Sequence, residues 1–110
     1  MLTEKIHLTE GIAIAGKRYR DVVVRAAIIQ DTLDIEKESK DQGIVYMSLA
    51  LLVKSIVELG NTDKDGAFIE RAAREDMSVD ALGTLNETDL ERLQVARDYL
   101  KKKQQWRKES

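Results

Sequence analysis

The chain has no cysteine and no proline, and aromatic residues make up only 5% of its 110 residues. Without cysteine it cannot form disulfides, thiolate metal sites or a cysteine nucleophile. With no proline and only six glycines, no segment has the composition of a linker, and we find no internal repeat. The sequence therefore predicts a single domain over residues 1–110, large enough for a modest hydrophobic core.

The chain also has no large excess of either charge, because it contains 18 basic and 20 acidic side chains. This balance does not favour a protein that coats duplex DNA, and we expect no nucleic acid partner. Residues 1–11 contain no apolar run long enough for a signal peptide, so we expect a cytoplasmic location. The longest apolar stretch, residues 44–59, is too short for a membrane span and contains Lys54, which predicts a protein partner and no membrane.

The N-terminal part, residues 3–25, alternates apolar with polar or small residues and ends in a run of valines. This pattern predicts two or three antiparallel strands. Gly16 and Lys17 suit a tight hairpin turn, but that register places Ile12 opposite Asp21. We therefore expect either a longer loop or a bulge near Asp21. Such a ribbon is marginally stable alone and must pack on helices.

The remaining residues up to 100 show helical spacing of apolar side chains. A first helix is expected over residues 26–38, with Asp31 on its solvent side. The most apolar helix, residues 44–59, is expected to be buried, to begin at a capping box that starts at Ser39, and to end at Gly60.

A helix over residues 67–75 is expected next, followed by a short turn that Ser78 caps. Asn86 is expected to cap the last helix, with Leu90, Leu93, Ala96 and Leu100 as its inward stripe. The sequence predicts an α+β fold: an N-terminal antiparallel ribbon of two or three strands (3–25) packed on about four helices (26–100). A flexible basic tail over residues 101–110 completes this prediction.

One segment imitates a metal site. Residues 61–66, NTDKDG, carry oxygen ligands at alternate positions and a glycine, as in an EF-hand calcium loop. The first position is Asn61, however, and the twelfth, where a bidentate glutamate is needed, is Ala72. We interpret the segment as a polar loop whose Asp63 or Asp65 caps the next helix. No metal and no cofactor are expected.

Catalytic groups are equally hard to find. His7 is the only histidine and is expected on the solvent face of a strand. The carboxylates of Asp31, Asp34, Glu36 and Glu38 follow the exposed side of the first predicted helix, which explains them without acid-base catalysis. No phosphate-binding glycine loop or serine nucleophile motif is present. We therefore expect no enzymatic activity and name no catalytic residue.

Residues 68–93 can be interpreted as a helix-turn-helix DNA reader, which would make the chain a regulator. The N-terminal turn of the second helix, which should meet DNA, contains Glu87, Asp89 and Glu91. These carboxylates would be repelled by phosphates, which disfavours this function. The cluster of lysines from Lys101 with Trp106 could also contact nucleic acid, although a lysine-rich helix end commonly serves only solubility.

The order of features resembles the phage tail assembly chaperones of contractile-tailed, Mu-like phages and prophages. The similar segments are KIHLTEGIAIAGKRYRDVVVRA (residues 5–26), the helix that carries Asp31, LALLVKSIVELG (49–60) and DMSVDALGTLNETDLERLQVARDYL (76–100). They cover nearly the whole chain, although the family's usual proline is replaced here by Ala26-Ala27.

This resemblance implies a non-enzymatic chaperone in the host cytoplasm that binds the tape measure protein until the tail tube polymerises around it. The chaperone would be absent from the finished virion. The tail tube protein and a second copy of the chain remain open as further partners, and the partner-binding residues are not identified. A tape measure protein presents apolar helical stripes, which an apolar helix or a free sheet edge could cover.

Overall fold

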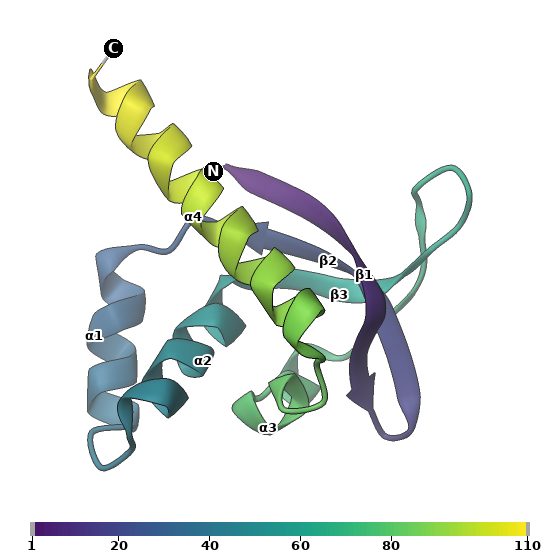
Figure 1. Cartoon of the computed structure of the whole chain (residues 1–110), viewed down its shortest axis with the longest axis horizontal. Helices are drawn as coiled ribbons and strands as arrows, with labels where there is room; N and C mark the ends of the chain where they lie inside the picture. Colours follow the sequence, from purple (N-terminus) through teal and green to yellow (C-terminus); the bar gives the residue numbers. More distant parts are fainter. Residues whose placement is uncertain (1, 110) are drawn as a thin grey trace.

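The computed structural model describes residues 2–109, with the side chains of residues 2–104. The fold is α+β, as predicted, but its antiparallel sheet has four strands in the order β1-β2-β3-β4 (Figure 1). The strands are β1 (Thr3–Ile14), β2 (Lys17–Arg25), β3 (Ile56–Thr62) and β4 (Phe68–Arg71). The helices are α1 (Ile29–Glu38), α2 (Ile44–Ser55), α3 (Val79–Leu82) and α4 (Glu87–Glu109), with a 3-10 turn, η1 (Arg74–Asp76).

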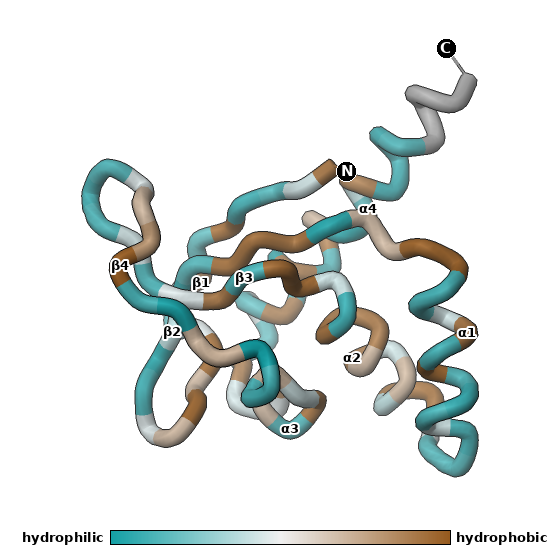
Figure 2. The backbone as a smooth tube through the Cα atoms, turned by 180° about the vertical axis from the view of Figure 1, so that it is seen from behind, coloured by the Kyte–Doolittle hydropathy of each residue, from teal (hydrophilic) through white to brown (hydrophobic). Residues whose placement is uncertain are grey.

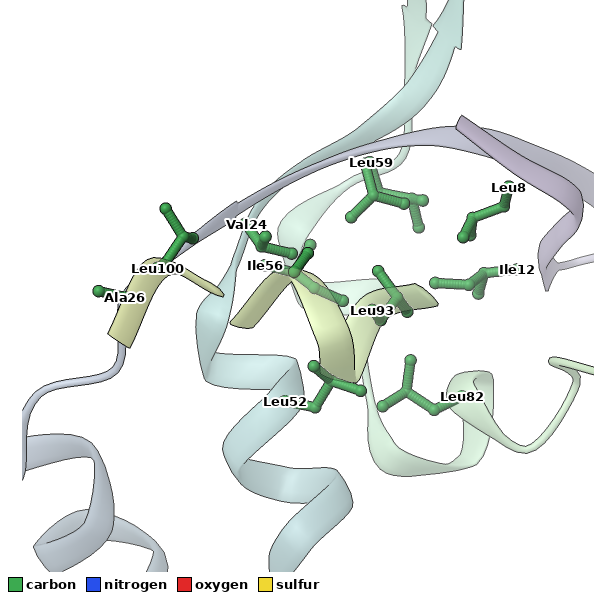
Figure 3. Close-up of a cluster of buried hydrophobic side chains, with 12 residues drawn as sticks. Leu8, Ile12, Val24, Ala26, Leu52, Ile56, Leu59, Leu82, Leu93 and Leu100 are labelled. Carbon is green, nitrogen blue, oxygen red and sulfur yellow. The ribbon is translucent and has the colours of Figure 1, made fainter. Parts of the chain in front are cut away.

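The hydrophobic core lies between one face of the sheet and helices α2, α3 and α4 (Figure 3). It is built almost entirely from aliphatic side chains, which fits the low aromatic content of the chain. In Figure 1, α1 lies beside α2 at the edge of the molecule, away from the sheet. The buried members of the core are Leu8, Ile12, Val22, Val24, Ala26, Leu52, Ile56, Leu59, Leu82, Leu93, Ala96 and Leu100.

The first hairpin turns one residue earlier than expected, at Ala15 and Gly16, which both have positive φ. Ile12 therefore pairs with Tyr19, whereas His7 pairs with Asp21, so residues 8–11 of β1 lie opposite Arg20 alone. A bulge was expected near Asp21, and the extra residues are on β1. Gly11, at φ 86°, is required here, because a Cβ at this position would lie 2.2 Å from the backbone oxygen of Tyr19.

The predicted helix over residues 44–59 is wrong in its second half. Helix α2 ends at Ser55, whose Oγ donates a hydrogen bond to the Leu51 backbone oxygen at 3.0 Å. The next residues, the β-branched Ile56 and Val57, begin β3. Ser39 does not cap α2 either: it ends α1, and Gly43 is the residue before α2.

The helix predicted over residues 67–75 is also wrong, because this segment forms β4 and η1. Gly60 does not end a helix but lies inside β3, where the backbone of β4 passes too closely for any side chain: a Cβ would be 2.1 Å from the Glu70 oxygen. Residues 68–93 consequently contain no first helix of a helix-turn-helix. The helical part predicted for residues 26–100 includes two strands.

The C-terminal predictions are largely confirmed. The Ser78 hydroxyl accepts a hydrogen bond from the Ala81 N–H at 3.2 Å, and Asn86 Oδ1 accepts one from the Asp89 N–H at 2.7 Å. Leu93, Ala96 and Leu100 are buried in the core. Helix α4 continues to Glu109, so the lysines from Lys101 to Lys103 are helical. The side chain of Trp106 lies outside the described residues, and flexibility of residues 101–110 stays a prediction.

Candidate protein-binding surfaces

His7 lies on an exposed face of the sheet, as predicted, with its side chain 71% exposed. Its Nδ1 is 2.8 Å from Oδ1 of Asp21, which is buried. The other Asp21 oxygen accepts hydrogen bonds from the backbone N–H and the hydroxyl of Thr62. Burial raises the pKa of Asp21, but these hydrogen bonds outweigh it and lower the pKa below its ordinary value. The pair joins β1, β2 and β3 and has a structural role.

The segment that imitates a calcium loop is the turn between β3 and β4. Asp63 Oδ1 accepts hydrogen bonds from the backbone N–H groups of Asp65 and Ala67, and Gly66 has φ 85°. Asp63 therefore stabilises a hairpin turn, and the prediction that it caps a helix is wrong. Within the described part of the chain, no three side chains of His, Asp or Glu gather as possible metal ligands.

Asp31 was predicted on the solvent side of α1 and is buried instead. Its two carboxylate oxygens accept hydrogen bonds from Nη1 and Nη2 of Arg25, at 2.8 and 2.9 Å, and one also accepts the Ile28 N–H. The Arg25 guanidinium lowers the pKa of Asp31 more than burial raises it. This bidentate pair fixes the start of α1 against the end of β2.

Asp89 makes the contact that sequence reasoning missed. The side chain is fully buried, and its oxygens accept hydrogen bonds from the N–H groups of Thr9, Glu10 and Gly11 and from the Thr9 hydroxyl, at 2.8 to 3.1 Å. The β1 bulge turns these consecutive N–H groups toward one carboxylate. Burial raises the pKa of Asp89, but the hydrogen bonds lower it to about 2. Asp89 therefore locks α4 to β1.

The first candidate binding surface is on α1 and α2, which we call the hairpin face. It consists of large apolar side chains that the protein leaves in solvent, and Figure 2 shows the hydrophobic colouring where the chain enters α1 and along α2. Isolated exposed apolar residues are ordinary, but a group of them on two neighbouring helices indicates a binding site. The members and their exposed fractions are Ile28 51%, Ile29 77%, Leu33 46%, Ile44 82% and Val45 71%.

The hairpin face corrects the prediction that residues 44–59 form a buried helix. Val45 and Leu52 are seven residues apart and share one side of α2, yet Leu52 is buried and Val45 is exposed. Leu52 belongs to the core cluster (Figure 3), whereas the first turn of α2 lies farther from the sheet (Figure 1). Only the C-terminal half of α2 belongs to the core.

A cleft of about 500 Å³ adjoins the hairpin face, between α1, α2 and α4. We call it the basic cleft, because the charged residues in its lining, among the described side chains of residues 2–104, are two cations of α4. The other described lining residues are apolar or neutral. The lining residues are Ala27, Ile28, Ile29, Thr32, Leu51, Arg97, Lys101 and Gln104.

A second groove, of about 710 Å³, lies between β1 and α4, and we call it the edge groove. β1 is an edge strand of the sheet, and Nη1 of Arg92 donates a hydrogen bond to the His7 backbone oxygen at 3.1 Å across this groove. Charges of both signs line it together with exposed Val95 and Tyr99. The charged lining residues are Glu4, Lys5, Glu91 and Arg92.

Comparisons with models of known protein families, with curated proteins and with solved structures found no match. Among the described helices, none is long and apolar enough to cross a membrane.

Proposed function

We propose that this chain is a non-enzymatic assembly chaperone of a contractile phage tail. It binds the tape measure protein in the host cytoplasm, covers its apolar helical stripes until the tail tube polymerises, and is left out of the virion. The tail tube protein and a second copy of the chain are possible further partners. The single observation that carries this proposal is the hairpin face, because it exposes apolar side chains on helices, the kind of surface that packs against another helix.

The size of the hairpin face suits reversible binding. Complete burial of one aliphatic side chain contributes about 1.5 to 3 kcal/mol, and the members of this face are already partly buried. Their combined contribution, after the entropic cost of association, is compatible with micromolar affinity, which corresponds to about 8 kcal/mol. A chaperone that tail tube subunits displace requires binding of this moderate strength.

The buried ionisable groups agree with a role other than catalysis. The carboxylates of Asp21, Asp31 and Asp89 are all hydrogen-bonded to the backbone or to neighbouring side chains. Their pKa values are all lowered, so they stay ionised and are poor general acids or bases near neutral pH. Each of them connects at least two segments of the fold.

The proposal is tested by producing the full chain together with a tape measure protein from the same phage or prophage. We expect the tape measure protein to be soluble and to purify as a complex with the chain, and to aggregate when produced alone. Mass spectrometry of finished particles should not detect the chain. A tape measure protein that stays insoluble in the presence of the chain, or a chain that is incorporated into particles, would contradict the proposal.

A matched pair of variants connects this test to the hairpin face. Ile29→Asp lies in the face, whereas Ile69→Asp introduces the same charge on β4, where Ile69 is 68% exposed. We expect Ile29→Asp to lose the complex and Ile69→Asp to keep it. The reverse result would place the binding surface on the sheet.

A further inference from the structure

We propose that the basic cleft binds one amphipathic helix of the partner, with an apolar stripe in the cleft and acidic residues beside that stripe. This inference rests on the proposed function, since it assigns the partner's chemistry at one end of the hairpin face. It also separates the basic cleft from the edge groove, whose lining carries charges of both signs.

The floor of the cleft has the length and character that a helix requires. Ile28, directly before α1, and Ile29, its first residue, line it from one side, and Leu51 lines it from α2. Ile44 is seven residues before Leu51 and thus on the same side of α2, and it is 82% exposed. Seven helical residues span about 10 Å, so the apolar strip matches about two turns of a docked helix. A docked helix would contact it through residues spaced i, i+3, i+4 and i+7.

The charged residues at the rim of the cleft indicate which charge a docked helix should carry. Arg97 and Lys101 are one turn apart on α4, so both cations face the cleft together. Neither forms an ion pair with a described residue within 4.0 Å. Because the described lining contains these two cations and no acidic group, it favours carboxylates on the approaching helix and disfavours lysines.

The edge groove provides the contrast. There Glu4 and Glu91 lie beside Lys5 and Arg92, so the local charges cancel. An acidic helix and a basic helix would therefore bind in that groove with similar affinity. Selection by charge is therefore a property of the basic cleft, and it can be measured.

The test uses two synthetic helical peptides with the same leucine stripe, one with glutamate and the other with lysine at the positions beside it. Fluorescence anisotropy with the full chain measures their binding. We expect the glutamate peptide to bind about tenfold more tightly, which corresponds to about 1.4 kcal/mol, because it can form two ion pairs at the cleft that the lysine peptide cannot form. This preference should decrease as salt is added. Equal binding of both peptides would overturn the inference.

Reversing the charges in the cleft should reverse the preference for the glutamate peptide over the lysine peptide. In the double variant Arg97→Glu/Lys101→Glu, we expect about tenfold weaker binding of the glutamate peptide and a gain for the lysine peptide. The matched control Lys64→Glu/Lys102→Glu has the same net charge, but its substitutions lie outside the cleft lining. It should change the affinity less than about twofold. An equal loss in the control would show a general charge effect and overturn the inference.

The remaining outcomes separate this inference from the proposed function. If the cleft variant binds the glutamate peptide like the unchanged chain but still forms the tape measure complex, the inference fails and the proposed function stands. If the glutamate peptide binds in the cleft but no tape measure complex forms, the proposed function fails alone. If the unchanged chain dimerises in size-exclusion chromatography and the cleft variant does not, a second copy occupies the cleft, which overturns the inference. Thermal melting confirms that both double variants are folded.

Discussion

The sheet with α4 and the hairpin of α1 and α2 are held together by different means. Where α4 crosses β1, the buried Asp89 carboxylate satisfies a row of backbone N–H groups above an aliphatic core. The hairpin is fixed mainly by Arg25–Asp31 and by the C-terminal half of α2, and it leaves large apolar side chains in solvent. The comparison indicates that the sheet and α4 are the scaffold and that the hairpin presents the binding surface.

The largest effect should follow from breaking the scaffold where the two regions meet. Leu52, on α2, is buried at 1% exposure among core residues. Leu52→Asp places an unpaired carboxylate there, and we expect a loss of about 4 kcal/mol or more in the free energy of unfolding. Because domains are stable by only about 5 to 15 kcal/mol, the variant should be largely unfolded. Circular dichroism with urea titration measures this, and a cooperatively folded variant would show that Leu52 is outside the core.

The next largest effect concerns the contact between Asp89 and the bulge. Asp89→Ala leaves the N–H groups of Thr9, Glu10 and Gly11 without their acceptor, of which that of Gly11 is buried, and we expect a loss of about 3 kcal/mol. Asp98→Ala is the control, because Asp98 is on the same helix and exposed. It should cost less than about 0.5 kcal/mol. Equal stability of the two variants would show that Asp89 does not stabilise the scaffold.

Acid should weaken the same contact, with a smaller loss in the free energy of unfolding than Asp89→Ala causes. The pKa of Asp89 is about 2 in the folded protein, below the value of about 3.9 expected when unfolded. Its contribution is thus complete above about pH 5 and is lost as the pH falls toward 2, with a total of roughly 2 kcal/mol.

Asp21 and Asp31 also have lowered pKa values and add to this acid loss. The contribution of Asp89 is therefore isolated by comparison with Asp89→Asn, measured by urea unfolding between about pH 6 and pH 3. Asp89→Asn should have a lower free energy of unfolding at neutral pH, and this free energy should decrease less on acidification than that of the unchanged protein. A parallel decrease in both proteins would contradict the role assigned to Asp89.

The sequence predicted the α+β class, the first hairpin, α1 and the caps at Ser78 and Asn86, because these depend on local patterns. Predictions from the sequence failed where tertiary contacts determine the secondary structure. Residues 56–59 fit either a helix or a strand, since Ile, Val and Leu satisfy both periods, and only pairing with β2 selects β3. The β-branched Ile56 and Val57 directly after Ser55 were a usable signal for the strand.

The candidate surfaces were less predictable than the fold. Asp89 is 78 residues from Gly11 in the sequence, and no local pattern indicates that a bulge in β1 provides its partners. The exposure of the hairpin face was equally hidden, because periodicity identifies one side of a helix but not the point at which the helix leaves the core. The pair of cations Arg97 and Lys101 lines the basic cleft only because α4 packs beside α1 and α2.

The smallest effect on stability, and the sharpest test of the comparison, should come from Val45→Asp. Val45 lies on the same side of α2 as Leu52, two turns earlier, but is 71% exposed. The new carboxylate is solvated and sits in the first turn of α2, where a negative charge is favourable, so the free energy of unfolding should change by less than about 0.5 kcal/mol. Binding to the tape measure protein should nevertheless weaken, whereas Ile69→Asp should leave it unchanged. Urea unfolding measures the first property, and co-purification with a co-produced tape measure protein measures the second. If Val45→Asp unfolds like Leu52→Asp, the first turn of α2 belongs to the scaffold and the two regions are one.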